Sequence, residues 1–185
     1  MKIAVFCGSS AGNNIEYINA TKRLGKYFAQ NNIEVVYGGG NVGLMGTIAD
    51  SVMENGGKVY GVIPEKLKEK ELAHRGITEL KVVSNMHERK AAMAELADAF
   101  VVLPGGAGTL EEIFEVWTWA QLGFHNKPCA FFNINGFYNK LFEMIDNMCE
   151  AEFLKQQYSD MLIKTDNQEE LLKAIKEYLP PKQKW

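Results

Sequence analysis

The sequence lacks several features that would place it in a specialised class of protein. Its 185 residues carry a formal charge of −3, so there is no basic excess to indicate nucleic acid or a membrane surface as a partner. No apolar run approaches the roughly 20 residues that a membrane-spanning helix needs. The opening stretch, MKIAVFCGSS, has one lysine and a short apolar run, and we interpret it as a first strand rather than a signal peptide.

Cysteine and histidine are also scarce. The three cysteines, Cys7, Cys129 and Cys149, are widely spaced and odd in number, which favours buried, reduced thiols in a cytoplasmic protein over a disulfide framework. The three histidines show no metal-ligand spacing, so we predict no metal site, and no cofactor is expected. There is no linker, low-complexity tract or internal repeat, and we expect residues 1–185 to form one domain.

What the sequence does contain is a repeated alternation of short apolar runs and helical patterns. Continuous apolar strands between helices are typical of a parallel sheet that is covered on both faces. We therefore predict a doubly wound, mainly parallel, Rossmann-like α/β fold. The expected strands span 2–8, 33–40, 58–64, 77–83, 100–104, 128–134 and 161–164, and the expected helices span 14–31, 43–57, 85–99, 109–123, 138–152 and 167–178.

Ligands of open α/β sheets bind beyond the carboxyl ends of the strands, and two strand-to-helix junctions there are rich in small residues. CGSS supplies Gly8 and Ser9, which suit either a tight turn or the close approach of a ligand. YGGGNVGLMG has Gly38, Gly40 and Gly43 at the spacing of a dinucleotide fingerprint. The next strand ends in GVIP, without the acidic residue of that fingerprint, so we favour a loop that approaches phosphate or ribose over an NAD site.

A third junction, SNMHERK, places two cations in the first turn of a helix. Ser84 or Asn85 can cap this helix, and Glu88 suits its first turn. Arg89 and Lys90 oppose the helix dipole there, at a cost of roughly 0.3–1 kcal/mol each. An anion bound at this helix end would explain the two cations, and a solvated pair that bends away from the helix is the alternative.

The fourth junction, LPGGAGTLEE, combines three glycines with two carboxylates. Thr109 and Glu112 have the spacing of a capping box, which would explain both residues without any function. A capping box does not require a bare glycine loop in front of it, whereas a phosphate-binding loop does. Together the four junctions indicate a nucleotide or sugar-phosphate enzyme, with hydrolysis as the expected chemistry.

MHERK at 86–90, followed by PGGAGTLEE at 104–112, resembles the signature pair of the LOG ("Lonely Guy") family of cytokinin riboside 5′-monophosphate phosphoribohydrolases. The resemblance covers nearly the whole chain and includes TWAQLGFHNKP after the second motif. It implies hydrolysis of the N-glycosidic bond of a nucleoside 5′-monophosphate, either AMP or an N6-prenylated AMP. It also implies a homodimer, for which the apolar helix that carries Trp117 and Trp119 is the expected contact.

Carried onto matching positions, the resemblance implies that Arg89 and Glu112 are catalytic. Together with the junction residues, the positions expected to contact the substrate are Gly8, Ser9, Gly40, Glu71, Met86, Lys90, Gly105, Gly106, Ala107, Gly108, Thr109, Glu111 and Thr118.

Two other functions remain open at this point. Molybdenum-cofactor carriers resemble this fold, so the chain could carry a phosphorylated cofactor without catalysis, although a carrier has no need of a carboxylate at a reacting carbon. Proteins of this kind have also been labelled lysine decarboxylases, but no lysine is placed in a recognisable pyridoxal phosphate site.

Overall fold

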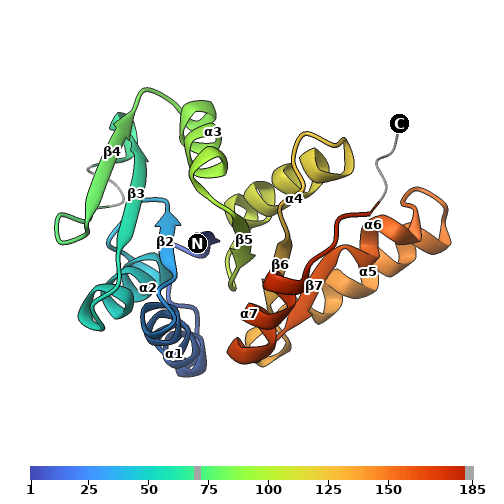
Figure 1. Ribbon diagram of the computed structural model, residues 1–185, viewed down its shortest axis with the longest axis horizontal. Coiled ribbons are helices and arrows are strands. Elements are labelled where there is room, and N and C mark those ends of the chain that lie inside the picture. Colours follow the sequence, from blue (N-terminus) through green and yellow to red (C-terminus); the bar gives the residue numbers. More distant parts are fainter. Residues whose placement is uncertain (69–71, 182–185) are drawn as a thin grey trace.

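The computed structural model, which describes residues 1–68 and 72–181, contains a seven-stranded sheet. Its strands are β1 (Lys2–Phe6), β2 (Glu34–Tyr37), β3 (Val59–Pro64), β4 (Glu79–Val83), β5 (Ala99–Val102), β6 (Cys129–Phe132) and β7 (Leu162–Thr165). Their order across the sheet is β4–β3–β2–β1–β5–β6–β7 (Figure 1). Every pairing between these strands is parallel, which confirms the predicted doubly wound, Rossmann-like class.

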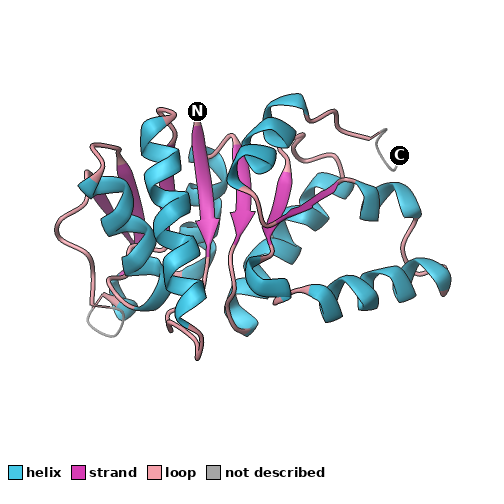
Figure 2. Ribbon diagram, turned by 90° about the horizontal axis from the view of Figure 1, so that it is seen from below, coloured by secondary structure: helices cyan, strands magenta, loops and turns pink. Residues whose placement is uncertain are grey.

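Helices cover both faces of the sheet (Figure 2). The α-helices are α1 (Ile15–Gln30), α2 (Gly43–Glu54), α3 (Met86–Leu96), α4 (Ala107–Gln121), α5 (Asn139–Glu150), α6 (Gln156–Asp160) and α7 (Gln168–Glu177). Apolar side chains of α1, α2 and α7 pack on one face, and those of α3, α4 and α5 pack on the other. Because successive strand residues point to opposite faces, Ile3 and Val5 join the first layer while Ala4 and Phe6 join the second.

All the predicted strands and helices are present, although their ends differ by a few residues. The short helix α6 was not predicted. Two 3₁₀ segments, Glu65–Leu67 and Ile134–Gly136, lie in connections. None of the helices in the described part of the chain is long and apolar enough to cross a membrane.

The capping box that the spacing of Thr109 and Glu112 offered as an alternative explanation does not form the start of α4. The helix begins at Ala107 rather than Thr109, and its N-cap is Gly106, which has an extended backbone and no side-chain cap. The Thr109 side chain is buried and folds over Gly105, where an added Cβ would lie only 2.2 Å from the Thr109 Oγ1. Since the helix starts two residues early, Glu112 falls in its second turn rather than at the N3 position that a capping box needs.

The order of the strands reverses beside β1, which pairs with both β2 and β5. The pairing of β1 with β5 continues past the ends of the strands, because the Gly8 N–H donates to the Pro104 carbonyl at 3.0 Å. The Leu44 N–H, in the first turn of α2, donates to the Gly8 carbonyl at 3.1 Å. Three of the four junctions singled out above therefore meet at this switch point, which is where open α/β sheets bind ligands.

Candidate active site

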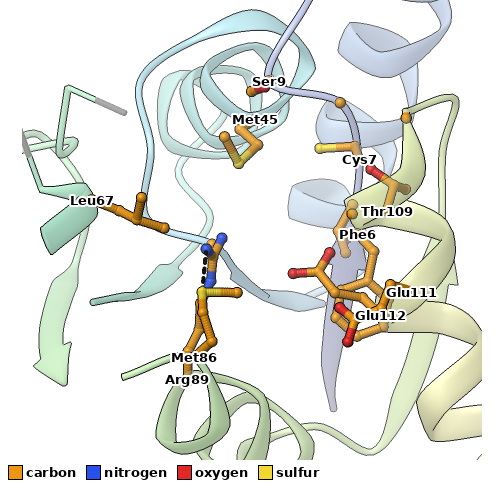
Figure 3. A pocket seen from close by; sticks show the side chains of 15 residues that line it. Phe6, Cys7, Ser9, Met45, Leu67, Met86, Arg89, Thr109, Glu111 and Glu112 are labelled. Atoms are coloured by element: carbon orange, nitrogen blue, oxygen red, sulfur yellow. Dashed lines mark hydrogen bonds between the residues drawn. The ribbon is translucent and has the colours of Figure 1, made fainter. Parts of the chain in front are cut away.

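A cavity of about 230 Å³ lies at this edge of the sheet, between α3 and α4 (Figure 3). Arg89 and Met86 reach into it from α3, and Glu111 and Glu112 lie across from them on α4. Leu67, from the connection after β3, forms a further part of the wall. The predicted residues that line the cavity are Gly8, Ser9, Met86, Arg89, Gly106, Gly108, Thr109, Glu111 and Glu112.

Arg89 is held by a well-capped helix. Asn85 is the N-cap of α3, and its side chain accepts from the Glu88 N–H at 2.9 Å. The Glu88 carboxylate accepts in return from the N–H of Ser84 at 3.0 Å and from its hydroxyl at 2.7 Å. These bonds hold the first turn of α3, so the Arg89 side chain, which is only 5% exposed, starts from an ordered backbone.

The position of the Arg89 guanidinium depends on a glycine at the end of β2. An added Cβ at Gly38 would lie 1.9 Å from the Arg89 Nη2. No side chain fits between this backbone and the guanidinium, so the backbone at Gly38 packs directly against Arg89 and forms part of the cavity wall. Gly38 belongs to the fingerprint-like spacing in the sequence, and in the structure its missing side chain leaves the space that the Arg89 guanidinium occupies.

The charges of Arg89 and Glu112 both act on the thiol of Cys7, at the end of β1. Burial raises the pKa of this thiol far above its ordinary value, the negative charge of Glu112 raises the pKa further, and the positive charge of Arg89 lowers it. The thiol therefore stays neutral and is a poor nucleophile. The groups in the cavity that are suited to chemistry are the guanidinium and the carboxylates.

Lys90 does not line the cavity. Its ammonium group forms an ion pair with Glu111 and a second one, at 3.3 Å, with Glu115, so that it ties α3 to α4. Burial lowers the pKa of Lys90, but its hydrogen bonds to Glu111 and Glu115 outweigh that effect and leave the pKa raised. The alternative of two solvated cations is wrong, since Arg89 is buried and Lys90 is held by carboxylates.

The start of α4 offers backbone donors to the cavity. The first N–H groups of a helix have no partner within the helix, and here they belong to the loop and turn around Gly106, Gly108 and Thr109. The dipole of a 15-residue helix adds a partial positive charge at the same point. This geometry suits an anion such as a phosphate.

The remaining predicted positions lie elsewhere. Gly40 forms an isolated antiparallel bridge with Ala73, and Gly105 borders a neighbouring cavity of about 280 Å³ on the α1 side. Ala107 is outside the lining, and Thr118 is exposed on α4, where its hydroxyl donates to the Phe114 carbonyl. Glu71 lies outside the described residues.

The lining also includes residues that the sequence analysis did not place in the site. Gly38 and Met45 belong to the glycine-rich run, which was a usable signal, whereas nothing marks Leu67 within a polar connection. The others are Val5, Phe6 and Cys7, at the end of β1. In the described ranges, no group of three or more His, Cys, Asp or Glu residues is placed to hold a metal ion.

A family model described as "Possible lysine decarboxylase" matches residues 45–175. The cytokinin riboside 5′-monophosphate phosphoribohydrolase LOG1 of Arabidopsis thaliana is 45% identical over 99% of this chain and 86% of its own length. The chain belongs to the LOG family. LOG3 of the same plant is 44% identical over 97% of this chain and 83% of its own length.

Solved structures of other proteins have the fold of this LOG-family chain. The molybdenum cofactor binding protein from Rippkaea orientalis has a TM-score of 0.71 at 19% identity, over 95% of this chain and 94% of its own. The molybdenum cofactor carrier protein MCP from Chlamydomonas reinhardtii has a TM-score of 0.72 at 17% identity, over 97% of this chain and 98% of its own. At such identities the likeness concerns the fold alone.

The contact between Gly38 and Arg89 can be tested with Gly38→Ala. The added methyl group must displace the guanidinium, and a displacement of about 1 Å at a reacting centre costs on the order of a hundredfold in rate. We therefore expect the phosphoribohydrolase kcat/KM toward a nucleoside 5′-monophosphate to fall by about that factor. Gly56→Ala is the control, because its Cβ meets open space at a φ of +79°, so it strains the backbone far from the cavity. Equal losses in the two variants would contradict the assignment.

Proposed function

We propose that this LOG-family chain hydrolyses the N-glycosidic bond of a nucleoside 5′-monophosphate, AMP or N6-prenylated AMP, to the free base and ribose 5-phosphate. The observation that carries the proposal is one cavity in which the buried Arg89 faces the carboxylates of α4 beside a helix N-terminus suited to phosphate. Relatives at 44–45% identity over nearly the whole chain are named for this reaction.

The proposed chemistry follows from the charge that develops during cleavage. As the C1′–N bond breaks, positive charge builds on the ribose ring, as it does in the hydrolysis of O-glycosides. The Glu112 carboxylate offsets that charge and orients the attacking water, whose hydroxyl bonds to C1′. The bonding electron pair leaves with the base, which takes up a proton, and Arg89 holds the substrate or stabilises the departing base.

The 5′-phosphate is assigned to the amides of the loop and first turn at Gly106, Gly108 and Thr109, with Gly8 and Ser9 close by in the lining. Lys90 was predicted to contact the substrate, but Lys90 is not among the lining residues, and its ammonium group forms ion pairs with Glu111 and Glu115. The phosphate is thus held by backbone donors, and Lys90 contributes by joining the two helices.

The two alternatives fit the cavity less well. A carrier of a phosphorylated cofactor would need the phosphate site, yet it would gain nothing from carboxylates opposite a buried arginine. A pyridoxal phosphate decarboxylase needs a lysine to form a Schiff base, and no lysine is among the described residues that line the cavity.

We also propose that the protein is a homodimer that associates through α4. Within one chain this helix buries Ile113, Val116 and Trp117, while Phe114 and Trp119 are only partly covered, so it is not buried on all sides. Thr118, on its exposed side, does not line the cavity of its own chain. The substrate contact implied for Thr118 by the family resemblance would therefore have to be made in a second subunit.

The proposed location is the cytoplasm. Cys7 and Cys129 are buried free thiols, and the third cysteine, Cys149, is also free. Free thiols of this kind persist in a reducing compartment.

The catalytic carboxylate is tested by Glu112→Gln. Glutamine keeps the shape of the side chain, but it can neither accept a proton nor offset a ribosyl cation, so base release from AMP should fall on the order of a hundredfold or more. AMP binding, measured by isothermal titration calorimetry, should stay close to that of the wild type. Glu95→Gln, at an exposed position of α3 and outside the lining, is the control and should keep full turnover. Full activity of Glu112→Gln would remove the proposed mechanism.

The phosphate assignment predicts a preference for nucleotides over nucleosides. Losing a set of charge-assisted contacts to the phosphate should lower kcat/KM for adenosine, relative to AMP, by about a hundredfold or more. The measurement is an HPLC assay of AMP and isopentenyl-AMP against the matching nucleosides, scored for released base. Equal turnover of adenosine and AMP would contradict the assignment.

The oligomeric state is tested by light scattering at micromolar concentration, where the wild type should have the mass of a dimer. Trp119→Glu places a charge on the partly covered side of α4 and should shift the protein to monomer, because a buried unpaired charge is costly. A monomeric wild type would remove the proposed interface.

A further inference from the structure

The connection from β3 to β4 is bound along the glycine loop that follows β2. We call its residues 72–76 the strap. The Asn41 N–H donates to the Leu72 carbonyl at 3.0 Å, and the His74 N–H donates to the Gly39 carbonyl at 2.9 Å. With the bridge between residues 40 and 73, these bonds make a short antiparallel pairing outside the main sheet.

His74 secures the strap through its side chain as well. Its Nδ1 accepts from the Gly76 N–H at 3.1 Å, so in the neutral ring the proton sits on Nε2. Nε2 lies 2.9 Å from the Oδ1 of Asp50, on α2, and donates to it. The His74 residue is only 8% exposed, whereas Asp50 is exposed. The ring therefore joins the strap to a helix of the main fold, through a residue that is 24 positions away in the sequence.

The strap reaches the active site by way of the glycine loop. Gly39, whose carbonyl accepts from His74, follows Gly38 directly, and Gly38 packs against the Arg89 guanidinium. The same β3–β4 connection supplies Leu67 to the cavity wall. Displacement of the strap would thus loosen two parts of the wall, while the helices that carry Arg89 and Glu112 would stay in place.

We propose that His74 and Asp50 are positioning residues for the active-site cavity: their hydrogen bond holds the strap, and the strap holds the Gly38–Asn41 loop and the Leu67 wall in the geometry that receives the nucleotide. This inference rests on the proposed function, because the ligand of the cavity is taken from it. Neither residue lines the cavity, so both act through the backbone that they fix.

The test compares Asp50→Ala with Asp50→Asn. Alanine removes the acceptor and favours the helix, whereas asparagine keeps an oxygen that can accept from His74 Nε2. With Asp50→Ala we expect the KM for AMP to rise about tenfold and kcat to stay within about threefold, because the loss falls on binding rather than on the transition state. Asp50→Asn should restore the KM to within about twofold of the wild type.

Trypsin cleavage after Arg75 reports on the strap itself. Arg75 is exposed and lies within the strap, so the rate of cleavage there follows local opening. Mass spectrometry of the fragments should show cleavage at this bond about fivefold faster in Asp50→Ala than in the wild type, and slower again when AMP is present. Glu34→Ala, which removes ion pairs with Lys2 and Lys58 at the amino end of β2, is the control and should change neither readout.

An unchanged KM in Asp50→Ala would overturn the proposal, even with faster cleavage after Arg75, because the pair would then hold the strap without shaping the site. Calorimetric titration with AMP keeps this outcome separate from a failure of the proposed function. If the wild type binds AMP but releases no base, the hydrolase proposal fails, whereas about tenfold weaker AMP binding by Asp50→Ala would still support the strap.

Discussion

The pairing of β1 with β5 at the centre of the sheet is the constraint on which the site depends. Their register sets Val5 opposite Val101 and Phe6 opposite Val102, so the two strands end level with each other. The loops that follow stay together through the bond between residues 8 and 104. Along the chain, α3 precedes β5 and α4 follows it, and both helices pack on the same face of the sheet. The N-termini of both helices therefore lie at this edge of the sheet. An arginine near the start of one helix and a carboxylate near the start of the other then share a cavity.

The geometry of helix α3 gives two adjacent cations different surroundings, one in the cavity and one against α4. Arg89 and Lys90 are adjacent, and a helix turns by about 100° per residue, so the first points into the cavity while the second points toward α4. The ion pairs of Lys90 with Glu111 and Glu115 join the two helices that carry the reacting groups. The Lys90 side chain is only 11% exposed, and a charge with so little access to water is stabilised by carboxylate partners of this kind.

The fold class and most elements could be predicted because both faces of the sheet are buried, which leaves continuous apolar strands as a clear local signal. The glycine loops, Arg89 and Glu112 could also be found, since each sits at a strand-to-helix junction. The local sequence pattern did not predict the role of a residue correctly where two explanations fitted the same residues. Thr109 and Glu112 have capping-box spacing, yet the helix begins at Ala107 with Gly106 as its N-cap, and the Thr109 side chain is buried over Gly105. Lys90 looked like a ligand for an anion, and only the neighbouring helix reveals its carboxylate partners.

The sequence by itself determined the alternation of strands and helices, the edge of the sheet that carries the polar groups, and the family to which the motifs belong. These depend on residues close together in the chain, whose spacing sets their local structure. Only the tertiary structure decided that Gly38 packs against Arg89, that Leu67 lines the cavity, and that His74 bonds to Asp50 on α2. The reason is physical: these contacts join segments tens of residues apart, and which of them meet is settled by the strand order and by the close packing of side chains between layers.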